Sequence, residues 1–278
     1  MISCCLFLSL LLLPACDNPF GEDEIEGENR VLSGVVSLPG MQNAKGVYVW
    51  LDGVNVGAFT DESGAFRLTL PPRSALKAAG TVTGDLDLYF YTINHLLVVK
   101  KVILRDGAVL YGSGDVDRNG EIKNVSLPKS FSVETRAVYP LPHETGYQSG
   151  LSMTAHFIAS LEGTKISIPN GSMILLGGCF VINVETDEVY LYQLPGTGAP
   201  FIASLGWREQ QWSFYPSSGD EILYWTPYRV IPFIFPYYPD LPKELLQSIG
   251  VSETTISEKY LNILFSGEFG QFERPEER

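Results

Sequence analysis

Oxygen-bearing side chains alternate in one short segment of the chain, and this spacing suits a hard cation. Asp115, Asp117 and Asn119 stand at alternate positions, and Glu121 follows Gly120. Carboxylate, amide and backbone carbonyl oxygens are the ligands that Ca²⁺ prefers, and a glycine permits the sharp turn that such a loop needs. One interpretation is therefore a weak calcium site, with Asp115, Asp117 and Asn119 binding through side chains and Glu121 through its backbone carbonyl.

The same segment also fits a turn between two strands. It matches the first half of an EF-hand loop, but position twelve is Ser126 instead of the bidentate glutamate, and no helix is expected before the loop. The Asn119-Gly120 pair is typical of a β-hairpin turn. If calcium binds, we expect it to raise the melting temperature, and Asp117→Ala should abolish that rise.

The three histidines do not form a catalytic or metal-binding pattern in the sequence. A metallocarboxypeptidase site needs a His-x-x-Glu pair and a further histidine. None of the three histidines, His95, His143 and His156, begins such a pair. His143 and Glu144 are adjacent, and adjacent side chains point to opposite faces of a strand. The chain also contains no Gly-x-Ser-x-Gly elbow and no phosphate-binding glycine loop. We therefore expect a protein that is not an enzyme.

Proline and aromatic residues are concentrated in residues 226–242, here called the Pro/aromatic belt. Repeated prolines exclude a long helix and a central strand. Exposed aromatic side chains often anchor partners, so a recognition surface is one interpretation, and a segment packed across a sandwich is the other. Recognition requires that Tyr237 and Tyr238 are exposed to solvent. The candidate binding residues are Tyr228, Phe233, Phe235, Tyr237 and Tyr238.

An apolar run near the N-terminus ends in Leu-Leu-Pro-Ala-Cys at residues 12–16. The run is shorter than the roughly 20 apolar residues that cross a bilayer core, but it suits the hydrophobic region of a signal peptide. With Leu13 three residues before Cys16, the segment resembles the lipobox of bacterial lipoproteins. This resemblance implies that residues 1–15 are removed and that Cys16 is acylated. An ordinary secretory signal or a short buried segment is the alternative.

Such an anchor would hold the protein at the cell membrane or the outer membrane, facing the periplasm or the exterior. More than one acyl chain gives stable attachment, whereas a single chain binds only marginally. Residues 16–30 are polar and acidic, and we expect them to form a solvated tether. The formal net charge of −13, without any basic cluster, disfavours nucleic acid as a partner.

Apolar and polar residues alternate with a period of two in several segments of the first half, which predicts β-strands. These segments are residues 31–38, 47–51, 66–70, 86–93 and 96–104. The sequence Asp-Glu-Ser-Gly at 61–64 predicts a hairpin loop, since Gly64 can adopt a positive φ. Residues 73–79 are expected to form a short helical turn.

Three of these stretches carry a resemblance to a known family. They read Gly34-Val35-Val36, then AKGVYVWL at 44–51, then TDESGAFRLTLP at 60–71. Over about residues 31–112 the chain resembles the carboxypeptidase regulatory-like domain, which implies a transthyretin-like β-sandwich. The matching positions are apolar strand residues and a turn glycine, so the resemblance implies a fold and no activity. We place this first domain at residues 31–128.

A second, mostly β domain is expected over residues 129–278. Residues 151–161 alternate strictly and predict a half-buried strand, and 174–184 and 189–194 continue the β pattern. Cys179 is alone in an apolar run and is expected to be buried. Short helices are predicted at 240–249 and 252–264. The expected fold class is mainly β, with two β-sandwich-type domains in tandem and a short helical C-terminal segment.

The leading functional hypothesis is a membrane-anchored envelope lipoprotein that acts as a non-enzymatic scaffold or binding module for an envelope protein or polysaccharide. One alternative is an accessory or inhibitor protein that binds a secreted enzyme or polysaccharide. Another is a hydrolase whose site the sequence does not reveal. Carboxylates or histidines that converge in a cleft would favour the hydrolase, and a flat aromatic patch would favour binding. No cofactor is expected apart from weakly bound calcium.

Overall fold

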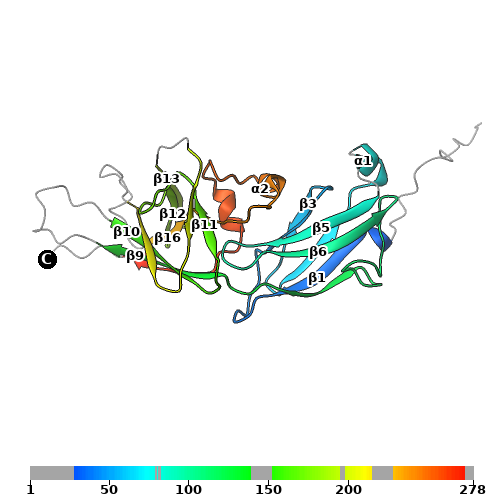
Figure 1. Ribbon diagram of the computed structural model, residues 1–278, viewed down its shortest axis with the longest axis horizontal. Helices are drawn as coiled ribbons and strands as arrows, with labels where there is room; N and C mark the ends of the chain where they lie inside the picture. The colour runs from blue at the N-terminus through cyan, green and yellow to red at the C-terminus, as the bar shows by residue number, and fades with distance from the viewer. Residues whose placement is uncertain are drawn as a thin grey trace, which may run out of the picture.

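The computed structural model describes residues 28–78, 80, 83–138, 152–194, 198–214 and 228–272. Within these ranges the chain is mainly β, as predicted, and its sheets pack in sandwich-like arrangements with a few short helices. The sheets of the N-terminal half and those of the C-terminal half lie side by side along the long axis (Figure 1). The division falls between β8 and β9, because no sheet contains strands from both sides of that point.

The first half consists of two sheets, one of three strands and one of five. The three-stranded sheet has the order β4 (Ala65–Thr69), β1 (Val31–Ser37) and β8 (Glu121–Ser126), and β1 is antiparallel to β4 but parallel to β8. The antiparallel five-stranded sheet has the order β3 (Val56–Phe59), β2 (Tyr48–Leu51), β5 (Gly84–Tyr91), β6 (Val98–Arg105) and β7 (Ala108–Val109). The short helices are η1 (Glu28–Arg30) and α1 (Arg73–Ala78), the latter at the predicted position.

The predicted hairpin at 61–64 is wrong, because the turn joins strands of two different sheets. β3 lies before it in the five-stranded sheet, and β4 after it pairs with β1. The Asp61 carboxylate accepts backbone N–H groups from Ser63 and Ala65, and Gly64 has a φ of +80°. A side chain on Gly64 would collide with the backbone of β1. Alternation shows which face of a strand is buried but not which strand is its partner.

The second half consists of three sheets, whose strands are antiparallel except for one parallel pair between β9 and β18. The first has the order β15 (Gln210–Phe214), β10 (Ser152–Ala159), β9 (Phe131–Val138) and β18 (Glu268–Phe269). The second has the order β14 (Phe201–Ser204), β11 (Lys165–Ile168) and β17 (Phe235–Pro236). The third has the order β13 (Val189–Gln193), β12 (Gly178–Asn183), β16 (Tyr228–Pro232) and β19 (Gln271–Phe272).

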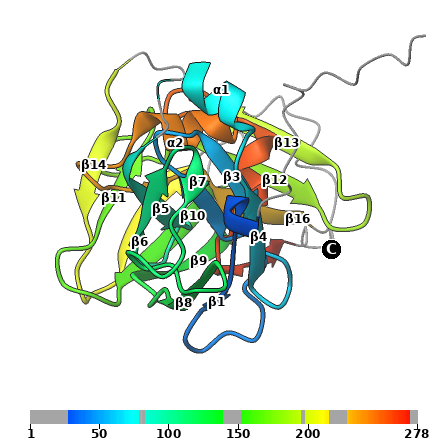
Figure 2. The same cartoon turned by 90° about the vertical axis from the view of Figure 1, so that its right-hand side faces the viewer.

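The helices near the C-terminus are shorter than the sequence predicted. α2 spans Lys243–Ser248 and begins after Pro242, and the stop at Gly250 is as predicted, with a φ of +67°. The second helix is a single 3₁₀ segment, η3 (Glu258–Asn262), instead of residues 252–264. Its cap is Ser257, whose side chain accepts the Lys259 N–H, because Ser252 is engaged in a tight turn instead. α1 and α2 lie on the same side of the molecule in both views (Figure 1 and Figure 2).

One hydrophobic cluster crosses the junction between the two halves. Tyr48, Trp50 and Tyr91 of the five-stranded sheet belong to the same buried cluster as Phe157 and Tyr260 of the second half. The side chains of the opposite face of that sheet form a separate core within the first sandwich. The two halves are therefore packed against each other through a buried, largely aromatic contact and not merely linked by the chain.

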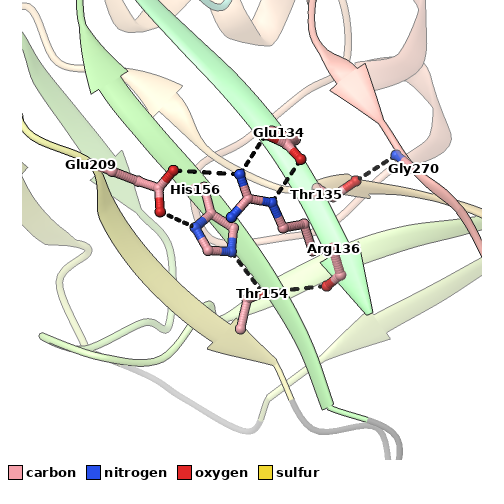
Figure 3. A network of polar contacts seen from close by, with 7 residues as sticks. All are labelled: Glu134, Thr135, Arg136, Thr154, His156, Glu209 and Gly270. Carbon is pink, nitrogen blue, oxygen red and sulfur yellow. Dashed lines mark hydrogen bonds and ion pairs between the residues drawn. The ribbon is translucent and has the colours of Figure 1, made fainter. Parts of the chain in front are cut away.

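The segment after η3 stabilises this junction through backbone hydrogen bonds to the first half. The Leu264 N–H donates to the Gly46 carbonyl at 2.8 Å, and the Leu264 carbonyl accepts from the Ile93 N–H at 3.0 Å. β18 then pairs with β9, and the Gly270 N–H donates to the Thr135 hydroxyl oxygen (Figure 3). The end of the described chain thus contacts both halves.

Candidate functional site

A cleft of about 500 Å³ opens at the junction of the two halves. The first half contributes the loop after β1 and the loop between β5 and β6, and the second contributes β9, β10, the residue before β15 and the segment around β18. The connection between β8 and β9 completes the wall. Clefts of this size at the contact between two structural units are typical of small-molecule sites.

His95 is the most unusual residue of this cleft. The residue is 1% exposed, and neither ring nitrogen has a hydrogen-bond partner in the described part of the chain. Burial, with a smaller effect of the nearby Lys129 ammonium, lowers the pKa of the imidazole to about 4. The ring is therefore neutral at pH 7 and offers one N–H donor and one acceptor nitrogen. Both ring nitrogens are themselves buried, so His95 is an unsatisfied polar group at the base of the cleft wall, and such a group costs stability.

The backbone around His95 is fixed by contacts from both halves. The His95 N–H donates to the Thr92 hydroxyl oxygen at 3.1 Å. The neighbouring Asn94 side chain donates to the carbonyls of Phe131 (3.1 Å) and Ser266 (2.6 Å) and accepts from the Ser266 N–H (3.1 Å). Since Asn94 is fully buried, these bonds hold the cleft wall rigidly across the junction.

Two charged side chains of the lining have no partner among the described residues, and two apolar side chains of the lining are exposed to solvent. Within the described ranges, Lys129 and Glu268 form no side-chain hydrogen bond or ion pair. Met41 and Ile158 are 38% and 40% exposed, and they come from different halves. The cleft thus has one positive and one negative side chain without a partner among the described residues, together with exposed apolar side chains, and the buried imidazole of His95 lies in its wall.

The remaining charged groups at the cleft are paired with one another on β9, β10 and the residue before β15 (Figure 3). The Arg136 guanidinium donates to both Glu134 oxygens at 2.6 and 2.7 Å, and this lowers the pKa of the Glu134 carboxyl. The same guanidinium reaches Glu209 at 3.5 Å, and the His156 Nδ1–H donates to the other Glu209 oxygen at 2.9 Å. Both carboxylates are therefore engaged within the cluster, where Glu134 and Glu209 share the single Arg136 guanidinium.

His156 also contacts a hydroxyl group. Its Nε2 lies 2.9 Å from Thr154 Oγ1, and its Nδ1 contacts the Glu209 carboxylate. This order of hydroxyl, imidazole and carboxylate is the one found in catalytic triads, where the imidazole activates a nucleophile. Thr154 is not part of the cleft lining, and its hydroxyl also lies 3.3 Å from the Arg136 carbonyl. The convergence of histidines and carboxylates at one cleft is nevertheless the feature that favours the hydrolase alternative.

The free energy of unfolding should fall as the pH is lowered from about 6.5 to about 4, and His95 should contribute to this fall. The folded imidazole has a pKa of about 4, compared with 6.5 for an unperturbed histidine. Between these values the unfolded chain binds the proton and the folded chain does not, so acid favours unfolding. Denaturant titrations at several pH values should show a steeper loss of stability for the wild type than for His95→Gln. Equal slopes would contradict a neutral, buried His95.

The predicted calcium loop forms a tight turn closed by an antiparallel bridge between Val116 and Ile122. The Asp117 carboxylate accepts the backbone N–H groups of Asn119 (2.8 Å) and Glu121 (3.0 Å) through one oxygen. The other oxygen lies 2.7 Å from the Lys123 ammonium. These contacts, with Lys123 the largest, lower the pKa of Asp117 to about 2. Asp117 therefore stabilises the turn itself.

Asp115 is directed toward β6 instead of toward Asp117. One of its oxygens accepts the Lys101 backbone N–H at 2.7 Å, and the other lies 3.5 Å from the Lys100 ammonium. Within the part of the chain that the structure describes, no group of three or more His, Cys, Asp or Glu side chains is arranged to hold a metal. Calcium binding by Asp115, Asp117, Asn119 and Glu121 stays a prediction that the melting experiment tests.

Over its described residues the Pro/aromatic belt is largely a packed segment, and the prediction that Tyr228, Phe233 and Phe235 lie on an exposed recognition surface is wrong. Tyr228, Phe233 and Phe235 are buried, and Tyr237 and Tyr238 are half-buried. The Tyr238 hydroxyl accepts from the Leu97 N–H at 3.0 Å and donates to the His95 carbonyl at 3.2 Å. The belt supplies β16 and β17 and part of the junction, because its aromatic rings gain more by burial than by exposure.

Cys179 is buried in β12, as predicted, and burial raises the pKa of its thiol. Cys16 and the acidic tether up to residue 27 lie outside the described residues. None of the helices within the described ranges has the length and apolar content needed to span a bilayer.

The sequence did not identify His95, Lys129 and Glu268 as members of one site. In the sequence His95 stands out only as a possible metal ligand, and Lys129 and Glu268 belong to no motif. They meet because His95 forms an isolated bridge with Lys129 and because β18, which contains Glu268, pairs with β9. The position of His95 between Ile93 and the apolar pair that follows it is the one local signal of a buried histidine.

Comparisons with known proteins give little information about this site. No family model matches the chain, and no curated protein matches it. Among solved structures, the chain is similar to "The Bacillus anthracis TIE protein", with 9% sequence identity and a TM-score of 0.23. The match covers 75% of this chain and 48% of that one, so this chain spans about half the length of that structure. A likeness this weak carries no argument about fold or function.

Proposed function

We propose that this protein is a membrane-anchored envelope lipoprotein that acts as a non-enzymatic binding module, with the cleft at the junction as its binding site. His95 carries the proposal, because it is buried, neutral and unpaired in the wall of a cleft of about 500 Å³. The lipobox-like residues 12–16 support the anchor. Function is inferred from this site and not from the sandwich fold, which serves many unrelated roles.

The first half serves in this proposal as a module of the carboxypeptidase regulatory-like type. The stretches 34–36, 44–51 and 60–71 support that assignment, together with the arrangement of β1 to β8 in two sheets. Its contribution to the cleft is made by two loops, one after β1 and one between β5 and β6. A rigid sandwich that presents ligand-facing residues on loops is a common design for binding proteins.

Acylation of Cys16 predicts how the protein distributes between cell fractions. Cys16→Ala should move the protein from the membrane fraction to the soluble fraction, because several acyl chains are lost at once. Cys179→Ala is the matched control, since that thiol is buried in β12 and should not affect the distribution. A Cys16→Ala protein that stays in the membrane fraction would contradict lipid anchoring through this residue.

Photo-crosslinking in cells tests the binding role of the cleft. A photoreactive amino acid in place of Met41, at the cleft, should capture a discrete protein, glycan or peptide that the same substitution at the exposed Met173, outside the cleft, does not capture. Capture of a secreted enzyme would identify the accessory or inhibitor role among binding functions. Identical products from both positions, or none from Met41, would contradict a binding role for the cleft.

A hydrolase is the second candidate, and one observation favours it. Thr154, His156 and Glu209 are linked by two contacts of 2.9 Å in the order nucleophile, base and orienting carboxylate. Treatment of the full-length protein with a fluorophosphonate should then give an adduct on Thr154 that His156→Gln prevents. Absence of an adduct would remove this candidate and leave the binding function unaffected.

A further inference from the structure

We propose that the cleft binds an unblocked short peptide, with the peptide carboxylate at Lys129, its ammonium group at Glu268 and its apolar side chains on Met41 and Ile158. This inference rests on the proposed binding role of the cleft and narrows it to one class of ligand.

Two charged side chains of opposite sign in the lining, each without a partner among the described residues, favour a ligand that carries both signs. Glu134 is bound by the Arg136 guanidinium, and Glu209 is bound by His156 and, more distantly, by Arg136. Lys129 and Glu268 have no such partner within the described chain. A simple anion would pair with Lys129 but be repelled by Glu268. A simple cation would pair with Glu268 but be repelled by Lys129. A zwitterion complements both groups, since matched charges favour one partner and repel the others.

His95 adds a requirement for a group that both donates and accepts a hydrogen bond. Its neutral ring has one N–H and one bare nitrogen, and both are unpaired among the described residues. Peptide groups offer these two functions, a carbonyl acceptor and an N–H donor, but both ring nitrogens are buried, so a peptide would reach them only after the imidazole rotates toward the cleft.

The apolar walls and the volume agree with this ligand class. Met41 and Ile158 are exposed on opposite sides of the junction, and an aliphatic ligand side chain between them would remove apolar surface from water. Methionine adapts its shape to differently sized partners, so the site would tolerate several side chains. The cleft of about 500 Å³ leaves room for more than one amino-acid residue.

The test measures binding of alanylleucine to the full-length protein in detergent micelles by isothermal titration calorimetry. The same dipeptide with its amine acetylated, and the same dipeptide with its carboxylate amidated, serve as charge-deleted probes. Alanylleucine should bind, and each blocked form should bind about tenfold more weakly, since each loses one ionic contact.

Two variants assign each end of the dipeptide to its residue. Glu268→Gln should weaken the binding of alanylleucine about tenfold but leave the binding of the acetylated dipeptide unchanged. Lys129→Met should also weaken the binding of alanylleucine about tenfold, but it should leave the binding of the amidated dipeptide unchanged. Both side chains are partly or fully accessible to solvent, so these variants should fold. Lys77→Met and Glu185→Gln, exposed and away from the cleft, are the matched controls and should bind as the wild type does.

The outcomes separate this inference from the proposed function. If alanylleucine does not bind at up to about 10 mM while Met41 crosslinking still captures a partner, the peptide assignment is overturned and the binding function stands. Binding that both charge variants leave unchanged also overturns the assignment, because the ligand would then lie elsewhere. Selective loss with the matching variant and blocked probe supports it.

Discussion

Replacing Phe233 with alanine should reduce the free energy of unfolding by about 3–5 kcal/mol, the typical loss for a large aromatic side chain deleted from a core. Phe233 is 1% exposed, and its ring packs edge-on against Phe180, Phe235 and Tyr260 at centroid distances of 5.0 to 5.9 Å. Deletion would leave a cavity at the centre of the second half. Urea denaturation followed by circular dichroism measures the change.

Trp207→Ala is the matched control for this experiment. Trp207 is also a large aromatic residue, but it is 64% exposed, so its removal should change the unfolding free energy by less than about 1 kcal/mol. A Phe233→Ala protein of unchanged stability would contradict the packed role of the Pro/aromatic belt and restore its interpretation as a surface. The comparison therefore decides between the two interpretations of residues 226–242.

Replacing Asn94 with alanine should destabilise the junction by about 2–4 kcal/mol, since each buried group left without its partner costs roughly 1–3 kcal/mol. The fully buried side chain joins the Phe131 carbonyl of β9 to the backbone and hydroxyl of Ser266. Its loss leaves the Ser266 N–H and two carbonyls without this partner. In thermal unfolding, we expect a lower midpoint and a broader transition as the two halves uncouple.

The control for Asn94 is Asn43→Ala. Asn43 also accepts a backbone N–H, from Lys45 at 2.7 Å, but it does so in an exposed loop and should contribute little. Asn94→Ala should also weaken ligand binding, because the same side chain fixes the backbone next to His95. A wild-type transition in Asn94→Ala would show that the hydrophobic contact alone holds the halves together.

The sequence predicted the strands of this protein better than their partners. Alternation of apolar and polar residues was enough to find β1, β4 and β10, because each has one face in a core. It did not predict that β1 pairs in parallel with β8 or that the turn at 61–64 joins two sheets. Pairing depends on residues far apart in the chain, and a period of two contains no information about them.

The candidate site was hidden from the sequence for the same reason. Asp115 and Asp117 resemble a cation site because their spacing is local, yet in the structure Asp115 binds the backbone of β6 and Asp117 stabilises a turn. His95 lacks any motif, and its significance comes from two unpaired nitrogens that only the folded chain reveals. Likewise the rings of Phe233 and Phe235 gave the same sequence signal as exposed aromatics, and only packing distinguishes the two cases.

The tie between Asn94 and Ser266 spans 172 positions of the chain, and this separation sets the order in which the molecule assembles. A chain that leaves a ribosome or a secretion channel N-terminus first can pair the strands of its first half early. It cannot close the junction until residues 264–272 have emerged. During that interval Trp50 and Tyr91 lack the aromatic cover that they have in the finished molecule. Contacts of such long range also make folding slow, so the nascent protein spends its most aggregation-prone period with this face open to a chaperone.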